Sequence, residues 1–243
     1  MALVQVGPQL DVKAIAPYRL TVANGTIESL KWLALVLMTL DHVNKYFFAE
    51  KLPGLFELGR LAMPLFGFVF AYNLARPGAL ETAALLRTVK RLAVAGLVAS
   101  PFFMALGGLA YGWWPLNIMF MLLVATVTLY LVEKGGSARL TAVAVFLIGG
   151  AFVEFWWFGL AFCLCAWWYC KYPSKKALVA WFIATALLYV VNRNLWAFAA
   201  MPLILAAPIL KVEAPRFKRL FYAYYPAHLA LLLAGSYLLS EHF

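Results

Sequence analysis

The stretch LKWLALVLMTLDHVNKYFF, residues 30–48, is apolar over most of its length but contains an aspartate and a histidine in its second half. About 20 predominantly apolar residues are needed for a helix to cross a bilayer, so this stretch predicts a membrane helix. Ionisable side chains are costly in the bilayer core and are kept there mainly for function. Asp41 and His42 are therefore the first candidates for a functional site.

The composition excludes an ordinary soluble domain. Of the 243 residues, 65% are hydrophobic and only 12% are charged, which is typical of a polytopic membrane protein. With about 20 residues per span and short loops, the length allows roughly eight to ten spans. We predict an all-α membrane bundle of about nine transmembrane helices, at approximately residues 30–49, 55–75, 87–107, 114–132, 139–153, 155–171, 177–192, 194–210 and 217–239.

Residues 1–29 differ from the rest of the chain because they contain Pro8, Pro17 and several charged residues. They lack the charged-then-apolar layout of a cleaved signal peptide. We expect two parts, a surface-lying or loosely ordered arm at residues 1–29 and a transmembrane helical domain at residues 30–243.

Basic residues concentrate in every second predicted connection. Those connections carry Arg76, Arg87, Lys90, Arg91, Lys134, Arg139, Lys171, Lys175, Lys176, Lys211, Arg216, Lys218 and Arg219. The other connections hold few positive charges, and the one between the fifth and sixth spans holds Glu154 alone. By the positive-inside rule we expect a multi-pass membrane protein with a cytoplasmic N-terminus.

The net charge of +10 is explained by this topology, because its basic residues are split among several loops. We therefore expect the lipid bilayer as a partner and no nucleic acid. Cys163, Cys165 and Cys170 have no paired spacing and no histidine nearby in sequence. Neither a metal site nor a disulfide framework is predicted.

Asp41 needs a partner other than His42, because neighbours on a helix point about 100° apart. Lys45 follows Asp41 by four residues and can pair with it locally. Arg60, in the predicted second span, lies near the same depth and is the other candidate. A pair with Lys45 would leave His42 as a packing residue, whereas a pair with Arg60 would join two spans. We predict the pair between Asp41 and Arg60, because each would otherwise be an uncompensated charge at similar depth.

Lys31 precedes His42 by eleven residues, which is three helical turns, so the two share a face about 16 Å apart. A substrate or cofactor of that length would reach both, although plain snorkelling also explains Lys31. In the last predicted span, His228 follows Tyr225, and Pro226 frees backbone carbonyls beside them. Asn117 at the start of the fourth span is a further polar residue.

Four segments in order resemble one known family, the TraX family of conjugative pilin-modifying membrane proteins. They are residues 30–48, LGRLAMPLFGFVFAYNLAR at 58–76, NIMFMLL at 117–123 and FYAYYPAHL at 221–229. The resemblance covers the chain from about Leu30 onward. The family also looks related to a wider group of transmembrane acyltransferases, in which a basic residue and a histidine separated by ten residues occur in the first span. Lys31 and His42 have that spacing, although the wider group usually has arginine first.

The resemblance implies an N-acetyltransferase that carries an acetyl group from acetyl-CoA to the amino terminus of a pilin subunit. His42 would be the general base, since histidine exchanges protons near neutral pH. Asp41 would hold the incoming ammonium or pair with Arg60, and Arg60 or Asn117 would face the oxyanion. His228, Tyr225 and Lys31 would position substrates. Phosphates of acetyl-CoA would meet basic residues on the cytoplasmic side, namely Arg87, Lys90, Arg91 and Arg219.

Three other functions stay open at this point. Related proteins act where the mature pilin is a closed ring, so head-to-tail pilin cyclisation is the main rival. A proton-coupled transporter would also place Asp, His and Arg in its spans. A non-enzymatic pilin chaperone would tolerate the loss of His42.

The predicted orientation is testable with a reporter. A periplasm-dependent reporter fused after Phe243 is expected to be active, because nine spans with a cytoplasmic N-terminus place the C-terminus outside the cytoplasm. A cytoplasm-dependent reporter at the same position serves as the control. Activity of the second reporter and silence of the first would contradict the span count.

Overall fold

The computed structural model describes residues 20–107, 110–210, 212, 214–217 and 220–240. Within these residues the chain forms helices and no extended strand, with two isolated β-bridges, Tyr111–Trp114 and Leu116–Val153. The prediction of an all-α fold is confirmed for the described part of the chain.

The helices follow the predicted spans in order. They are α2 (Asn24–Phe47), α3 (Pro53–Gly59), α4 (Ala62–Leu74), α5 (Thr82–Ala105), α6 (Ile118–Lys134), α7 (Ala138–Phe152), α8 (Trp156–Lys171), α9 (Lys175–Leu187), α10 (Tyr189–Asn192), the 3₁₀ helix η2 (Trp196–Ala199), α11 (Ala200–Ala206) and α12 (Leu220–Ser240). Among the described residues, three stretches are long and apolar enough to cross a membrane: Pro53–Leu74, Thr82–Ala105 and Lys175–Asn192. The number of crossings and the orientation stay predictions.

The first helix starts earlier than the boundary expected at residue 30. It begins at Asn24, and Thr26 in its first turn donates a hydrogen bond from Oγ1 to the carbonyl of Leu210, 2.5 Å away. This contact ties the start of α2 to the chain just after α11. Residues 1–19 of the expected arm lie outside the described residues.

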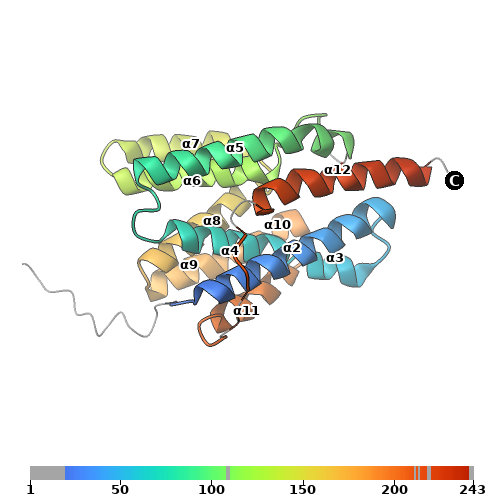
Figure 1. Ribbon diagram of the computed structural model, residues 1–243. Coiled ribbons are helices and arrows are strands. Elements are labelled where there is room, and N and C mark those ends of the chain that lie inside the picture. Colours follow the sequence, from blue (N-terminus) through green and yellow to red (C-terminus); the bar gives the residue numbers. More distant parts are fainter. Residues whose placement is uncertain (1–19, 108–109, 211, 213, 218–219, 241–243) are drawn as a thin grey trace, which may run out of the picture.

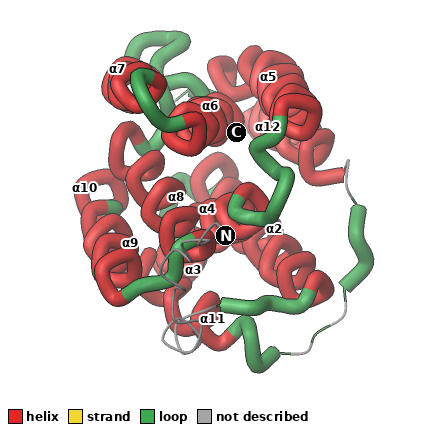
Figure 2. The backbone as a smooth tube through the Cα atoms, turned by 90° about the vertical axis from the view of Figure 1, so that its left-hand side faces the viewer, coloured by secondary structure: helices red, strands yellow, loops and turns green. Residues whose placement is uncertain are grey.

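The helices form two layers (Figures 1 and 2). One layer contains α5, α6, α7 and α12, and the other contains α2, α3, α4 and α8 to α11. The layers are joined where α12 packs on α2 and where α6 packs on α8. Buried apolar side chains of α2, α4, α6, α8, α9 and α11 make up the main core.

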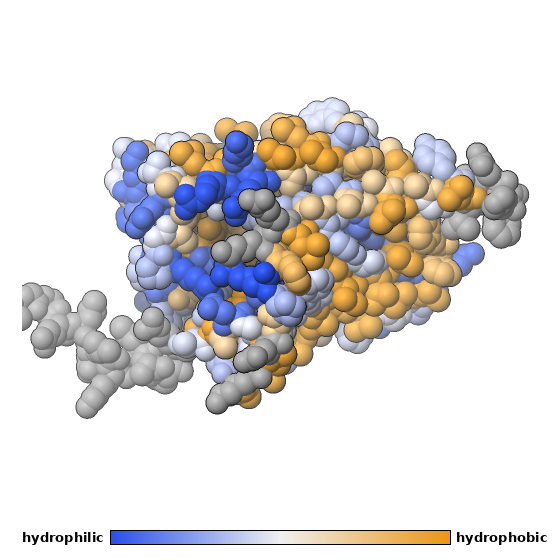
Figure 3. All heavy atoms as spheres, viewed as in Figure 1, coloured by the Kyte–Doolittle hydropathy of each residue, from blue (hydrophilic) through white to orange (hydrophobic). Residues whose placement is uncertain are grey.

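Hydrophilic residues gather at the left-hand end of the molecule in Figure 3. We call the region around the start of α2 the basic end. Lys31 and Arg216 both lie beside Glu28, Arg76 donates to Asn24, and Arg91 lies within electrostatic reach of Tyr222, the neighbour of Phe221 beside Lys31. The rest of the visible surface is largely hydrophobic, as expected for helices that face lipid.

Candidate functional site

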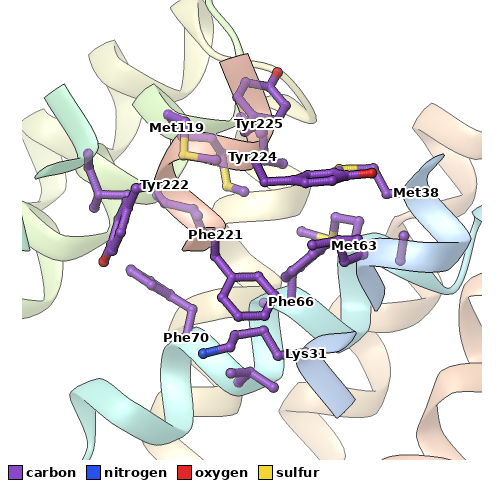
Figure 4. A pocket seen from close by; sticks show the side chains of 18 of the residues that line it. Lys31, Met38, Met63, Phe66, Phe70, Met119, Phe221, Tyr222, Tyr224 and Tyr225 are labelled. Atoms are coloured by element: carbon purple, nitrogen blue, oxygen red, sulfur yellow. The ribbon is translucent and has the colours of Figure 1, made fainter. Parts of the chain in front are cut away.

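A cavity of about 700 Å³ lies between the two layers. Phe66 and Phe70 of α4 face Phe221 and Tyr222 of α12 across it (Figure 4). Both Lys31 and His42 of α2 line it, so the prediction that they share one face of the helix is confirmed; their functional roles stay predictions. The cavity extends from the basic end to the pair of residues, Asp41 and His42, that the sequence singled out.

His42 is held by a second histidine. Its Nδ1 lies 2.8 Å from Nε2 of His228 on α12, and the two rings are nearly parallel, with an interplanar angle of 3°. The other ring nitrogen of His228, Nδ1, lies 3.2 Å from the carbonyl oxygen of Tyr224. Each histidine therefore has a hydrogen-bond partner that determines which of its ring nitrogens carries the hydrogen.

These contacts assign the tautomers of both neutral rings. A carbonyl can only accept, so Nδ1 of His228 carries the hydrogen and Nε2 of His228 is the acceptor. Nδ1 of His42 must then donate to it, which leaves Nε2 of His42 without a hydrogen. No described residue hydrogen-bonds to that nitrogen, so it is free to take a proton from a bound molecule.

Two neighbouring tyrosines stabilise this arrangement. The ring of Tyr224 stacks on His228 with centroids 5.3 Å apart, and its hydroxyl lies 2.7 Å from Oγ1 of Thr39 on α2. Tyr225 is buried, lines the cavity and contacts His228 with centroids 5.5 Å apart. His228 itself does not line the cavity. It reaches the site only through its hydrogen bond with His42.

Asp41 pairs with Arg60, and this prediction is confirmed. Nη2 of Arg60 lies 2.6 Å from both carboxylate oxygens of Asp41, and both side chains are mostly buried. Arg60 stands at the break between α3 and α4. The alternative partner, Lys45, forms no ion pair with Asp41 in the described structure; its ammonium lies over the ring of Tyr46.

One donor of the Arg60 guanidinium, Nε, has no hydrogen-bond partner among the described residues. This nitrogen is buried, while the group stacks on Phe56 at 4.3 Å from the ring centroid. A buried donor without a partner costs free energy. Arg60 itself lines the cavity, but this nitrogen has no exposed surface there. A small shift of the guanidinium would bring it to an oxygen of a bound molecule.

Asn117 has a different place from the one expected. Its carbonyl oxygen caps α6 by accepting from the backbone nitrogen of Met119, and its amide donates to the Gly96 carbonyl and to Ser100 Oγ on α5. It is fully buried and does not line the cavity. These contacts are those of a helix cap that joins α6 to α5, and they leave no amide group for a substrate.

The predicted phosphate-binding residues divide into three groups. Arg91 lines the cavity, whereas Arg87 and Lys90 line a neighbouring apolar groove between α5 and α12. Arg219 lies outside the described residues. The charge pattern assigns Arg76 and Arg216 only to topology, but both line the cavity at the basic end.

Lys31 is held in place by Glu28 and Phe221, neither of which the sequence patterns singled out. Its ammonium lies 2.6 Å from Oε2 of Glu28, one turn earlier, and 4.1 Å from the ring centroid of Phe221. Glu28 is buried and also lies 3.5 Å from Nε of Arg216. The spacing of Glu28 and Lys31, three residues apart on a helix, is a sequence signal that would have revealed this pair.

Comparison with known proteins shows the family. The profile described as TraX protein matches residues 26–235, which is most of the chain. The chain belongs to the TraX family. It is also 36% identical over 124 residues to a protein of Escherichia coli named Protein TraX; the match covers 51% of this chain and 46% of that protein. The chain therefore aligns with less than half the length of this TraX relative. No solved structure matches the chain.

The described residues of this TraX-family chain contain no group of three or more His, Cys, Asp or Glu placed to hold a metal ion. Cys163 is buried and Cys165 and Cys170 are partly buried, all as free thiols. The side chains that reach the cavity therefore offer proton transfer, charge and hydrogen bonding as their chemistry.

The close approach of α2 and α3 at Gly59 gives a test of the site. A Cβ at this position would overlap the side chain of Asp41, so Gly59→Ala is expected to displace the carboxylate that Arg60 holds. The matched control is Gly54→Ala in the same helix, where a Cβ meets nothing within 4 Å. Thermal unfolding in detergent should show a loss of about 1–3 kcal/mol for Gly59→Ala and little change for Gly54→Ala. Equal stability of the two variants would contradict the packing described.

Proposed function

We propose that this protein is a pilin-modifying enzyme of the bacterial inner membrane, which transfers an acetyl group from acetyl-CoA to the amino terminus of a pilin subunit. Its N-terminus would lie in the cytoplasm, where the basic end meets the donor. The observation that supports this proposal best is one cavity with a free His42 Nε2 deep inside and four cations at its basic end. The family match and the E. coli relative support membership of the TraX family, on which this proposal is built.

The reaction needs a base because the acceptor nitrogen loses two protons. The pilin's α-ammonium gives up one proton to become a nucleophile, since its ordinary pKa is near 8. The nitrogen then attacks the thioester carbonyl carbon, and the C–S bond breaks as the second proton leaves. One of these protons ends on the departing thiolate and one is released.

His42 is the group placed to move a proton between nitrogen and sulfur. Its Nε2 can accept a proton from the attacking amine and pass it to the leaving thiolate. While the proton is held there, Nδ1 continues to donate to His228, which keeps the ring in one orientation. His228 is therefore a positioning residue in this proposal and His42 the catalytic base.

Arg60 would stabilise the negative charge that develops on the carbonyl oxygen. Its unpartnered Nε supplies a donor, and the contact with Asp41 fixes the guanidinium before substrate binds. A donor fixed in advance is worth more than one that must reorganise during the reaction. Asp41 is committed to this contact, so in this proposal it does not bind the amine.

The basic end fits the phosphates of acetyl-CoA. Lys31, Arg76, Arg91 and Arg216 surround this part of the cavity, and guanidinium groups bind phosphates in pairs of hydrogen bonds. The distance of about 16 Å between Lys31 and His42 along α2 suits an extended thioester. Arg87 and Lys90, beside Arg91, and Arg219 would add to the attraction for an anionic donor.

The test is intact-mass analysis of the pilin after incubation with the purified enzyme in proteoliposomes. The wild-type protein is expected to add one acetyl group, and only when acetyl-CoA is supplied. His42→Gln should lower the rate by about 10²–10⁴-fold, because general-base help is lost. Retained binding of acetyl-CoA by this variant is the control for folding. His228→Gln, which changes the histidine outside the cavity lining, should lower the rate less.

Each rival function has its own outcome in this experiment. A pilin product lighter by one water, formed without acetyl-CoA, would replace acetyl transfer by cyclisation. An unmodified pilin with both proteins intact would favour a chaperone or a transporter. Normal acetylation by His42→Gln would overturn the role of His42 while keeping the reaction.

A further inference from the structure

Glu154 occupies an unusual turn between α7 and α8. Its backbone nitrogen donates to the carbonyl of Leu116, 2.8 Å away, and the nitrogen of Leu116 donates to the carbonyl of Phe152 at 2.7 Å. The next two residues, Phe155 and Trp156, have φ angles of 60° and 48°. Such left-handed conformations cost about 1–3 kcal/mol each for residues other than glycine and cluster at functional sites.

This turn brings the carboxylate of Glu154 to the cavity that contains His42. The carboxylate lies within electrostatic reach of the backbone of Ile118 and of the cations of Lys45 and Arg60. No cationic group of the described residues lies within ion-pair distance of it. A partly buried carboxylate without an ion-pair partner is costly, and a bound cation would offset that cost.

Two tyrosines of the cavity lie within electrostatic reach of the same carboxylate. Tyr46 comes from α2 and Tyr225 from α12, and both line the cavity. Aromatic rings attract ammonium groups through their π faces, and a carboxylate adds a charged hydrogen-bond acceptor. The three side chains together have the chemistry of an ammonium-binding site.

We propose that Glu154, with Tyr46 and Tyr225, binds the primary ammonium group of the acceptor, the α-amine of the pilin. This inference deepens the proposed function and rests on it for the identity of the acceptor. It gives the amine a carboxylate of its own. Of the other carboxylates that line the cavity, Asp41 is used by Arg60, Glu28 is used by Lys31, and Glu50 is exposed to solvent. The site would serve acetylation and cyclisation equally, since both reactions use the same amine.

Lys45 offers a competing explanation for Glu154. It also lines the cavity, and its ammonium lies 5.3 Å from the ring centroid of Tyr46. If Glu154 only balances the charge of Lys45, its loss affects stability and not the recognition of the acceptor. The experiment must therefore measure recognition directly.

The test compares two synthetic peptides with the first ten residues of the pilin of the same conjugation system, one with a free α-amine and one Nα-acetylated. Binding to the full-length protein in detergent is measured without acetyl-CoA. The wild-type protein is expected to bind the free-amine peptide at least about tenfold more tightly. Glu154→Gln should reduce this preference to less than about twofold. Glu133→Gln is the matched control, because Glu133 pairs with Lys171 and does not line the cavity.

An unchanged preference in Glu154→Gln would overturn the ammonium site. Should that variant fail to fold, Tyr46→Leu carries the test, with an expected drop in preference of roughly threefold and no drop if the proposal is wrong. Lys45→Met should keep the full preference for the free-amine peptide. If Lys45→Met loses this preference while Glu154→Gln keeps it, Lys45 and not Glu154 recognises the amine. A wild-type protein that prefers the free amine but never acetylates pilin would contradict the proposed function alone.

Discussion

The ion pair between Asp41 and Arg60 is the contact on which the geometry of the site depends. Two charges in an apolar bundle are tolerated only when each compensates the other. Gly59 lets α3 approach Asp41 closely, and the break between α3 and α4 brings Arg60 to face it. The pair therefore fixes α2 against α3 and α4, and both of its side chains line the cavity. It also fixes the guanidinium, whose Nε has no hydrogen-bond partner among the described residues.

Two consequences follow from the use of Asp41 by Arg60. His42 cannot take its orientation from the carboxylate next to it, so it is oriented by His228 on α12 and, through it, by the Tyr224 carbonyl. In the proposed ammonium site the amine needs another carboxylate, and Glu154 on the α7–α8 turn is a partly buried carboxylate that lines the cavity without an ion pair among the described residues. The site is thus assembled from α2, the α3–α4 break, α12 and a turn, all distant in sequence.

The parts of this site that are local or forced by charge could be predicted from the sequence. Helical spacing placed Lys31 and His42 on one face, and the cost of a lone charge predicted the Asp41–Arg60 pair. The contact between His42 and His228 joins residues 186 positions apart and depends on how α12 packs on α2, which no local pattern specifies. The sequence alone predicts Glu154 to be a solvated loop residue, because a single acidic residue in a connection is usually exposed to water. Asn117 was assigned to the substrate, although an asparagine just before an apolar helix is also typical of an N-cap.

The most direct test of this account is a double-mutant cycle on the ion pair, measured as unfolding free energy in detergent. Asp41→Asn and Arg60→Gln each leave one buried charge without its partner, and each should cost about 3–5 kcal/mol. The double variant leaves neither charge, so its cost should be smaller than the sum of the two by well over 1 kcal/mol. Costs that add to within about 0.5 kcal/mol would show that the two side chains do not interact, and would contradict the arrangement on which the site is built.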